Sequence, residues 1–226
     1  MRRPSGDRPA AAPTRHRTAS REVGLTVVKI GGSCATSIDL RRWTATVAGC
    51  VGRVAIVPGG GPFADAVRET QSTIGFDDAA AHHMALLAME QFGRALASFD
   101  HRLSLADNAT ALRRDRYQGR VPIWLPTRMV LAAADIPPSW DVTSDSLAAW
   151  LAGKLGARRL LLLKQVELPC APVRAAVLAT RGIVDPAFPR FLAASGVPAF
   201  VLGPADHMAI ADALCDDPSR GTPIVV

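Results

Sequence analysis

Short apolar runs alternate with helix-length segments from residue 25 to the end of the chain, and this alternation limits the possible folds most strongly. The runs that we predict as strands are 25–30, 53–57, 121–125, 159–163, 197–202 and 223–226. Between them lie the predicted helices 38–50, 62–73, 77–99, 143–156, 187–195 and 205–215. Such alternation forms βαβ units, whose right-handed crossovers place helices on both faces of a largely parallel sheet. The pattern therefore predicts an α/β fold whose ligands bind at the carboxyl ends of the strands.

Length and composition indicate one domain preceded by a tail. A chain of 226 residues, of which 49% are hydrophobic, can bury one sizeable core, and we assign this domain to residues 22–226. Residues 1–21 hold six arginines and one acidic residue among several Ala, Pro, Ser and Thr residues, and we expect them to be disordered. Organelle transit peptides share this arginine-rich start, but prolines interrupt any amphipathic helix here.

The charge distribution argues against a nucleic-acid partner. The tail supplies +5 (six arginines minus one aspartate) of the net charge of +6, so the domain has no basic face to follow a phosphate backbone. No apolar stretch approaches the roughly 20 residues of a membrane span, so we expect no membrane partner. The four cysteines form no C-x-x-C pair, which is typical of a cytoplasmic protein without zinc sites or disulfides.

Only three lysines occur among the 26 basic residues, and two of them end apolar runs. Lys29 leads directly into Gly31 and Gly32, where an ammonium group beside backbone N–H groups suits phosphate oxygens. The alternative is a lysine that only reaches solvent from a strand end. Because the chain otherwise uses arginine, we favour phosphate contact for Lys29 and keep Lys164 as a second candidate. Lys154 lies in a helical pattern and is expected at the surface.

A second glycine turn, 58–62, follows the second predicted strand and opens a helix. The free N–H groups and the positive dipole end of that helix favour an anion. A flexible βα turn is the alternative, because Gly and Pro are common in loops. Three successive glycines exceed what a turn needs, so we favour close approach of a ligand.

Two aspartates lie at the entrance of the predicted helix 143–156. Thr143 or Ser144 can cap this helix, and Asp145 suits its dipole, so capping explains part of the segment. Capping does not explain Asp141. Two carboxylates four residues apart can orient lysine ammonium groups or interact with nucleotide-bound Mg²⁺. We assign Asp145 as the organiser of the lysines and Asp141 as a substrate contact.

The adjacent residues His82 and His83 invite a metal interpretation that their spacing weakens. Neighbours on a helix point about 100° apart, whereas a zinc pair usually needs an i, i+4 separation. We therefore predict no metal site and expect His82 to face the substrate. The apolar residues of 77–99, including Met84 and Leu87, are expected in the core.

Taken in order, these motifs resemble the amino acid kinase superfamily, which includes acetylglutamate, aspartate, glutamate and uridylate kinases. The motifs are Lys-Ile-Gly-Gly-Ser, Gly-Gly-Gly-Pro, Thr-Ser-Asp-Ser-Leu-Ala-Ala and Leu-Leu-Leu-Lys, and the resemblance covers residues 25–226. It implies a three-layer αβα sandwich, usually a homo-oligomer, that binds ATP with Mg²⁺ over the carboxyl ends of the strands. The second substrate would lie beside the nucleotide.

The resemblance also implies roles for single residues. Lys29 would contact the transferring phosphoryl group, and Asp145 would hold the lysines in place. Lys164 matches a lysine at the end of the same strand in uridylate kinases. The nucleotide phosphates would lie against Gly31, Gly32 and Ser33. The acceptor would lie against Gly59, Gly60 and Gly61.

Within the superfamily the chain is most similar to the aminomethylfuran phosphate kinase-like members, which are associated with methanofuran-type one-carbon cofactors. The similar segments are 60–65, 81–85, 140–146 and 184–188. One segment departs from the family pattern. Relatives usually follow the late strand with an Asp-Gly turn that borders the nucleotide, whereas residues 166–172 read Val-Glu-Leu-Pro-Cys-Ala-Pro. The region after this turn, where many relatives have another lysine, offers only Arg174 and Arg181.

The motifs supply cations and glycines but no evident general base. Phosphoryl transfer passes through a loose transition state, which positioned cations and N–H groups can stabilise. An acceptor that is already anionic, such as a phosphate monoester or a carboxylate, needs no base at neutral pH. We therefore expect a kinase acting on such an acceptor. The alternatives are a uridylate or acetylglutamate kinase-like enzyme, a catalytically silent nucleotide-binding or storage protein on the same fold, and a dinucleotide-binding dehydrogenase. No G-x-G-x-x-G follows the first strand, which argues against the dehydrogenase.

Overall fold

The computed structural model describes residues 24–169, 171–204, 214 and 221–226. The predicted tail 1–21 and nearly all of the predicted helix 205–215 lie outside these residues. The strands are β1 Thr26–Ile30, β2 Val54–Pro58, β3 Leu103–Ala106, β4 Val121–Trp124, β5 Arg159–Leu163, β6 Val173–Arg174, β7 Ala199–Leu202 and β8 Thr222–Val225. The helices are the 3₁₀ helix η1 Gly32–Thr36 and the α-helices α1 Leu40–Ala48, α2 Gly61–Ile74, α3 Asp78–Ala97, α4 Ala109–Tyr117, α5 Thr127–Leu131, α6 Ser144–Leu155, α7 Ala175–Thr180 and α8 Phe188–Ser195.

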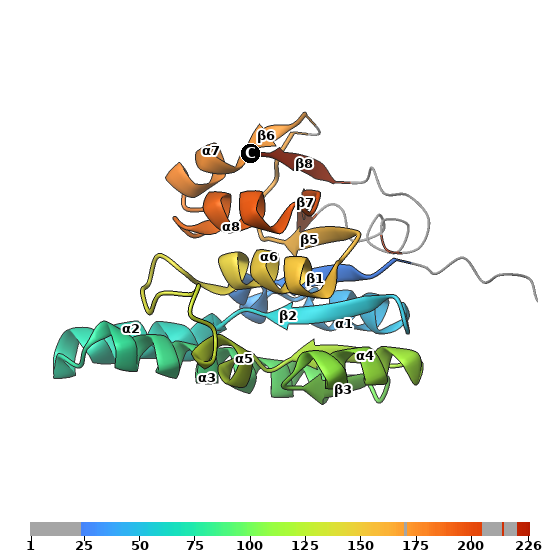
Figure 1. Cartoon of the computed structure of the whole chain (residues 1–226), viewed down its shortest axis with the longest axis horizontal. Helices are drawn as coiled ribbons and strands as arrows, with labels where there is room; N and C mark the ends of the chain where they lie inside the picture. Colours follow the sequence, from blue (N-terminus) through green and yellow to red (C-terminus); the bar gives the residue numbers. More distant parts are fainter. Residues whose placement is uncertain (1–23, 170, 205–213, 215–220) are drawn as a thin grey trace, which may run out of the picture.

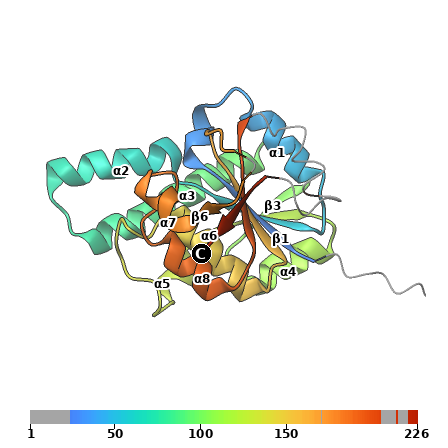
Figure 2. The same ribbon diagram turned by 90° about the horizontal axis from the view of Figure 1, so that it is seen from above.

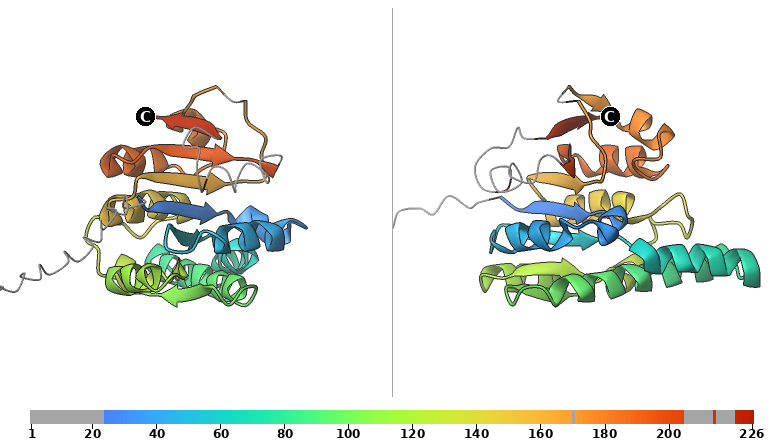
Figure 3. Two further views of the ribbon diagram at one scale, coloured as in Figure 1. Left: turned by 90° about the vertical axis from the view of Figure 1, so that its right-hand side faces the viewer. Right: turned by 180° about the vertical axis from the view of Figure 1, so that it is seen from behind.

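The strands form one sheet in the order β3-β4-β2-β1-β5-β7-β8-β6, which Figure 3 shows from the green strand β3 to the red and orange strands β8 and β6. All neighbours run parallel except β7 and β8, which run antiparallel. Every residue of β1, β2, β4 and β5 is buried, as expected of central parallel strands covered on both faces. The predicted α/β fold with a mostly parallel sheet is confirmed.

Two hydrophobic cores lie on opposite faces of the sheet (Figure 2). The core on the side of α1 contains Trp43 together with Leu96 from α3. The other core contains Leu112 from α4, Leu151 from α6 and Phe188 from α8. These two layers of helices around the sheet make the three-layer αβα sandwich. Among the described helices, none is long and apolar enough to cross a membrane.

Several short elements are absent from the sequence-based assignment. They are η1, β3, β6, α4, α5 and α7. β3 has only four residues and keeps Leu105 exposed, and α4 contains few apolar residues among its arginines. Met84 and Leu87 are exposed rather than in the core, because they lie on the outer face of α3, whereas Leu86 and Met89 on its inner face are buried.

The central strands bring the sequence motifs to one edge of the sheet. In the parallel register, Ile30 of β1 is level with Pro58 of β2 and with Leu163 of β5. The turns that follow these three strands therefore lie side by side. The α2–α3 hairpin extends beyond this edge (Figure 1), and residues of both helices line a cavity beside the turns.

Candidate active site

A buried carboxylate joins the two lysines at the carboxyl edge of the sheet. The Nζ atom of Lys29 lies 2.8 Å from Oδ1 of Asp145, and Nζ of Lys164 donates to Oδ2 at 2.7 Å. All three side chains are at most 10% exposed. The structure thus brings together the three residues that the sequence predicts as catalytic, although they are as many as 135 positions apart in the chain (164 − 29).

Secondary structure explains this convergence. Lys29 is the fourth residue of β1, and Lys164 follows the last residue of the neighbouring strand β5. Asp145 lies in the first turn of α6, which packs against both strands. The helix N-terminus favours a negative charge there, and the two ammonium groups compensate that charge on its other side.

Burial and charge oppose each other in this cluster. Burial raises the pKa of the Asp145 carboxyl, but Lys164 and Lys29 outweigh burial and lower the pKa to about 2. Burial also lowers the pKa of Lys164 to about 8, although the Asp145 carboxylate opposes this shift. Lys29 adds to the lowering through repulsion. The cluster therefore carries an excess positive charge below about pH 8, which suits a polyanion.

The two glycine turns pack directly against each other. A Cβ atom on Gly59 would lie 2.3 Å from the backbone nitrogen of Gly32, and one on Gly32 would lie 2.6 Å from the nitrogen of Gly61. Gly61 also has a φ of +55°, which disfavours other residues. The expectation from sequence was close approach of a ligand. The structure gives a packing reason for these glycines, because the close neighbour of each turn is the other turn, and close approach of a ligand stays a prediction.

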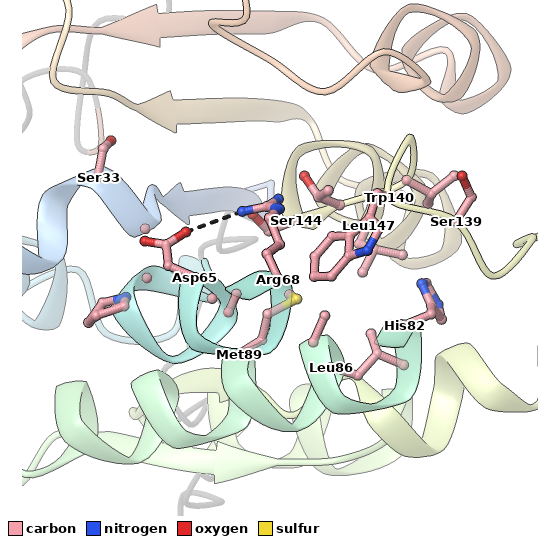
Figure 4. Close-up of a pocket in the computed structure, with 18 of the residues that line it drawn as sticks. Ser33, Asp65, Arg68, His82, Leu86, Met89, Ser139, Trp140, Ser144 and Leu147 are labelled. Carbon is pink, nitrogen blue, oxygen red and sulfur yellow. Dashed lines mark hydrogen bonds and ion pairs between the residues drawn. The ribbon is translucent and has the colours of Figure 1, made fainter. Parts of the chain in front are cut away.

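Two cavities meet at the turn after β1. The lysine cavity has a volume of about 330 Å³ and is lined by Lys29, Gly32, Ser33, Lys164, Gln165, Val166, Gly182 and Ile183. The second, which we call the α2–α6 cavity, has a volume of about 390 Å³ and lies between α2, α3 and the start of α6 (Figure 4). Gly32 and Ser33 line both cavities. A group held at this turn can therefore contact ligands in both.

The α2–α6 cavity combines an apolar floor with a few polar groups. Its apolar wall includes Leu86, Met89, Val142 and Leu147. Among the described residues that line it, Arg68 is the only arginine or lysine, and its guanidinium lies 4.3 Å from the ring centre of Trp140. Asp65 forms an ion pair with Arg68 at 3.2 Å, and Figure 4 shows both side chains at the cavity. Such exposed pairs contribute about 0–1 kcal/mol, so a charged ligand can replace this one.

Trp140 is held in place from two sides. Its indole Nε1 donates to Oε1 of Gln71 at 2.7 Å, and Arg68 stacks on its ring. Both partners belong to α2, whereas Trp140 belongs to the loop before α6. The contact therefore joins the two walls of the α2–α6 cavity and presents an aromatic face beside the guanidinium.

His82 lies in the wall of the α2–α6 cavity, while its neighbour His83 is exposed. Burial lowers the pKa of His82, against the effect of its hydrogen bond with the Ser139 backbone. The imidazole is therefore neutral at pH 7 and can serve as a hydrogen-bonding group but not as a cation. No group of three or more His, Cys, Asp or Glu residues that could hold a metal occurs in the described part of the chain.

Some predicted site residues lie away from both cavities. The backbone amide of Gly31 donates to Leu163 O at 3.1 Å, so it is already used by the sheet. The amide of Gly59 likewise donates to Ile30 O at 2.8 Å. Asp141 is exposed, and its neighbours Trp140 and Val142 line the α2–α6 cavity without it. Gly60 and Gly61 do line that cavity.

Arg68 was missed by the sequence assignment, although the spacing contains a signal for it. Gly61, Ala64, Asp65 and Arg68 are spaced at i, i+3, i+4 and i+7, so they share one face of α2. A basic residue on the same helix face as the glycine turn is therefore a candidate for anion contact. The sequence did not mark Met89 as a cavity residue, because the apolar residues of α3 are expected to pack in the core.

The lysine cavity fits the phosphates of a nucleotide. It offers two ammonium groups, the helical turn at Gly32 and the Ser33 residue, and none of its described lining residues has a carboxylate. Mg²⁺ would therefore arrive bound to nucleotide oxygens rather than to protein ligands. The departure from the family pattern borders this cavity, since Gln165 and Val166 form part of its wall.

Comparison with known proteins agrees with this arrangement. The chain is 27% identical over 115 residues to (5-(aminomethyl)furan-3-yl)methyl phosphate kinase from Methanocaldococcus jannaschii, a match that covers 51% of this chain and 53% of that protein. The matched part thus spans about half the length of that curated relative.

Solved structures show the same fold at low sequence identity. Uridylate kinase from Archaeoglobus fulgidus superposes with a TM-score of 0.69 and 18% identity, covering 89% of this chain and 100% of that chain. UMP kinase from Ureaplasma parvum superposes with a TM-score of 0.64 and 17% identity, covering 90% of this chain and 99% of that chain. The model of the amino acid kinase family matches residues 24–167, which hold both glycine turns, Asp145 and both lysines. The chain therefore belongs to the amino acid kinase family.

Proposed function

We propose that the protein is a kinase that transfers the γ-phosphoryl group of ATP to a small anionic acceptor. The observation that supports this most directly is the junction of two cavities at Gly32 and Ser33, beside two lysines held by one carboxylate. The nucleotide phosphates would occupy the lysine cavity, and the acceptor would occupy the α2–α6 cavity. The transferring group would pass between them over the turn after β1.

The lysines supply the electrostatic part of the reaction. As the bond to the leaving oxygen lengthens, negative charge on the transferring group is stabilised by the ammonium groups of Lys29 and Lys164. Asp145 keeps the two ammonium groups in position, and it is too weak a base to take a proton from the acceptor, because its pKa is about 2 and each of its oxygens is paired with an ammonium group. Mg²⁺ bound to the nucleotide would neutralise further phosphate charge. An acceptor oxygen that is already anionic needs no proton removal.

The walls of the α2–α6 cavity favour a small ring with both a positive and a negative group. Trp140 and the apolar wall suit a flat ring, Arg68 suits a phosphate or carboxylate, and Asp65 suits an ammonium group. The substrate named for the archaeal relative, an aminomethylfuran methyl phosphate, combines these features. We therefore propose an acceptor of this class, with a role in the synthesis of a methanofuran-type cofactor.

The test is a screen of ATP consumption with small phosphate monoesters and carboxylates. The panel includes the aminomethylfuran methyl phosphate, UMP and N-acetylglutamate. We expect turnover with the first and formation of a diphosphate product that mass spectrometry identifies. Lys29→Ala should abolish this turnover, whereas the matched control Lys154→Ala, at a half-exposed lysine outside the site, should retain it.

Other outcomes of this screen would contradict parts of the proposal. Preference for UMP or N-acetylglutamate would replace the acceptor class while keeping the kinase activity. If no acceptor is phosphorylated but calorimetry shows that the protein binds ATP, the silent nucleotide-binding protein is favoured, which the unusual segment 166–172 also allows.

A further inference from the structure

Asp185 makes four hydrogen bonds to the start of α6, although it is about 40 residues away in the sequence. Its Oδ2 atom accepts from Thr143 N at 3.1 Å, from Thr143 Oγ1 at 2.8 Å and from Ser146 N at 3.0 Å. Its Oδ1 atom accepts from the hydroxyl of Ser146. The carboxylate is buried, with 7% of the residue exposed. Asp185 is therefore built into the helix entrance rather than into a solvent-exposed loop.

These bonds replace the usual cap of α6. Thr143 occupies the N-cap position, but its side chain makes no capping hydrogen bond to the helix and donates instead to Asp185. The carboxylate of Asp185 accepts the N–H of Ser146, which a capping side chain would normally satisfy. The first turn of α6 is consequently fixed by a distant segment and not by its own sequence.

Asp145 lies between the two residues that Asp185 holds. Thr143 precedes it by two positions and Ser146 follows it directly, so the backbone on both sides is tied to one carboxylate. A second tie links the same segments, because Ala187 N donates to Asp141 O at 3.0 Å. The next residue, Phe188, is fully buried at the start of α8, which packs along α6. The anchor is thus rigid on its own side as well.

Asp185 itself is outside both cavities, since it is absent from their walls. Burial and the charge of Asp145 raise the pKa of Asp185, against the hydrogen bonds from Ser146 and Thr143. Burying a carboxylate near a second carboxylate costs free energy, which stabilising contacts must offset. The four hydrogen bonds to the helix entrance provide those contacts.

We infer that Asp185 is a positioning residue, which fixes the first turn of α6 and so keeps the Asp145 carboxylate between Lys29 and Lys164. This inference rests on the proposed function for its catalytic consequence, but its structural part can be measured without any substrate. Loss of the anchor would let Asp145 retreat, and Lys164 would stay buried near Lys29 with a weaker counter-charge. The pKa of Lys164 would then fall below its native value of about 8.

The low lysine content makes this pKa measurable. Protein labelled with ¹³C-lysine gives signals from only three residues, Lys29, Lys154 and Lys164. Titration of the full chain should give a Lys164 midpoint that is lower by about half a pH unit or more in Asp185→Asn than in the wild type. Lys154 lies outside the site and serves as the internal reference.

A second variant separates positioning from direct electrostatics. Ser146→Ala removes one hydrogen bond to Asp185 but keeps the Asp185 charge, so it should shift the Lys164 midpoint in the same direction. A shift in Asp185→Asn alone would mean that the charge acts through space, and this would overturn the inference. No shift, or an upward shift, in both variants would also overturn it. If Asp185→Asn fails to fold, Ser146→Ala decides the question alone.

Kinetics test the catalytic consequence. With the acceptor identified by the screen, Asp185→Asn should lower kcat at least roughly tenfold and change KM for the acceptor less than about threefold. The matched control is Asp115→Asn, which alters a buried carboxylate away from the site and should leave kcat unchanged. An unchanged kcat in Asp185→Asn would overturn the catalytic part. If the wild type phosphorylates no acceptor, the proposed function fails while the lysine titration still judges the positioning.

Discussion

Replacing Asp145 with asparagine should destabilise the protein by an amount that depends on pH. The substitution keeps the size of the side chain but leaves Lys29 and Lys164 without the carboxylate that lies 2.8 and 2.7 Å from their Nζ atoms. Removing one partner of a buried ion pair costs about 3–5 kcal/mol. At about 2–4 °C per kcal/mol for a chain of this size, the melting temperature should fall by roughly 10 °C.

The destabilisation by Asp145→Asn depends on pH because Lys164 can lose its proton. In the native protein the pKa of Lys164 is about 8, and loss of Asp145 should lower it further. Between that lower value and about 8, the folded wild type holds more protons than the folded variant, while their unfolded chains hold equal numbers. The free energy of unfolding of the variant therefore rises with pH relative to the wild type, by at most ~1.4 kcal/mol per pH unit. The destabilisation is largest in mild acid and shrinks as pH approaches about 8.

Asp115→Asn is the matched control for this experiment. Asp115 is also buried, but its partners Arg114 and Arg120 are arginines, which stay protonated throughout. Chemical denaturation at about pH 6.5 and about pH 8.5 should give a smaller loss for Asp145→Asn at the higher pH and equal losses for Asp115→Asn. Equal losses for Asp145→Asn at both values would refute the assignment of Lys164 as a proton-releasing member of the cluster.

Four other predictions concern turnover and the tail. Lys29→Ala should abolish phosphoryl transfer without unfolding the domain, as circular dichroism would show. Lys29→Arg should also have low turnover, because a planar guanidinium group cannot replace a compact ammonium group. If the effects of Lys29→Ala and Asp145→Asn on turnover are additive in a double-mutant cycle, the two residues do not act as one electrostatic unit. Turnover should fall as pH rises through about 8, where Lys164 loses its charge, and a flat pH–rate profile would contradict this. Arg68→Ala should raise KM for the acceptor roughly tenfold or more with little change in kcat, and an unchanged KM would exclude Arg68 from binding. Deletion of residues 1–21, which lie outside the described residues, should leave melting temperature and turnover unchanged, and a loss of several degrees would show that they pack on the domain.

The central sheet could be predicted from the sequence because its strands are buried on both faces. Strands such as β1 and β5 are mostly apolar, and a lysine marks the carboxyl end of each, since Lys29 is the next-to-last residue of β1 and Lys164 directly follows β5. β3 and β6 lacked this signal, since one is a four-residue edge strand and the other has two residues. α4 could have been found from its N-cap, because Asn108 accepts a hydrogen bond from Ala111 N at 2.9 Å.

The candidate site divides in a similar way. Lys29, Lys164 and Asp145 could be singled out from the sequence. Two lysines end apolar runs in a chain that otherwise uses arginine, and Asp145 is one of two carboxylates four residues apart at the entrance of a helix. Arg68 and Asp185 were not assigned, because their roles depend on contacts between α2 and the loop before α6, and between residue 185 and α6. A pattern along the chain does not show which distant segments lie close together in the fold. Such residues become visible only when the fold has placed them together.

The site uses lysine rather than arginine at its two buried basic positions, and the physical properties of the two side chains explain this difference. This chain uses only three lysines among 26 basic residues, yet two of them converge on one carboxylate. Each oxygen of Asp145 takes one ammonium group, an arrangement that a compact charge with three donors allows and that two planar guanidinium groups would crowd. Burial lowers the pKa of Lys164 to about 8, whereas an arginine there would stay charged at any accessible pH. The two lysines thus concentrate positive charge where a transferring phosphoryl group would develop negative charge, and Asp145 sets their spacing.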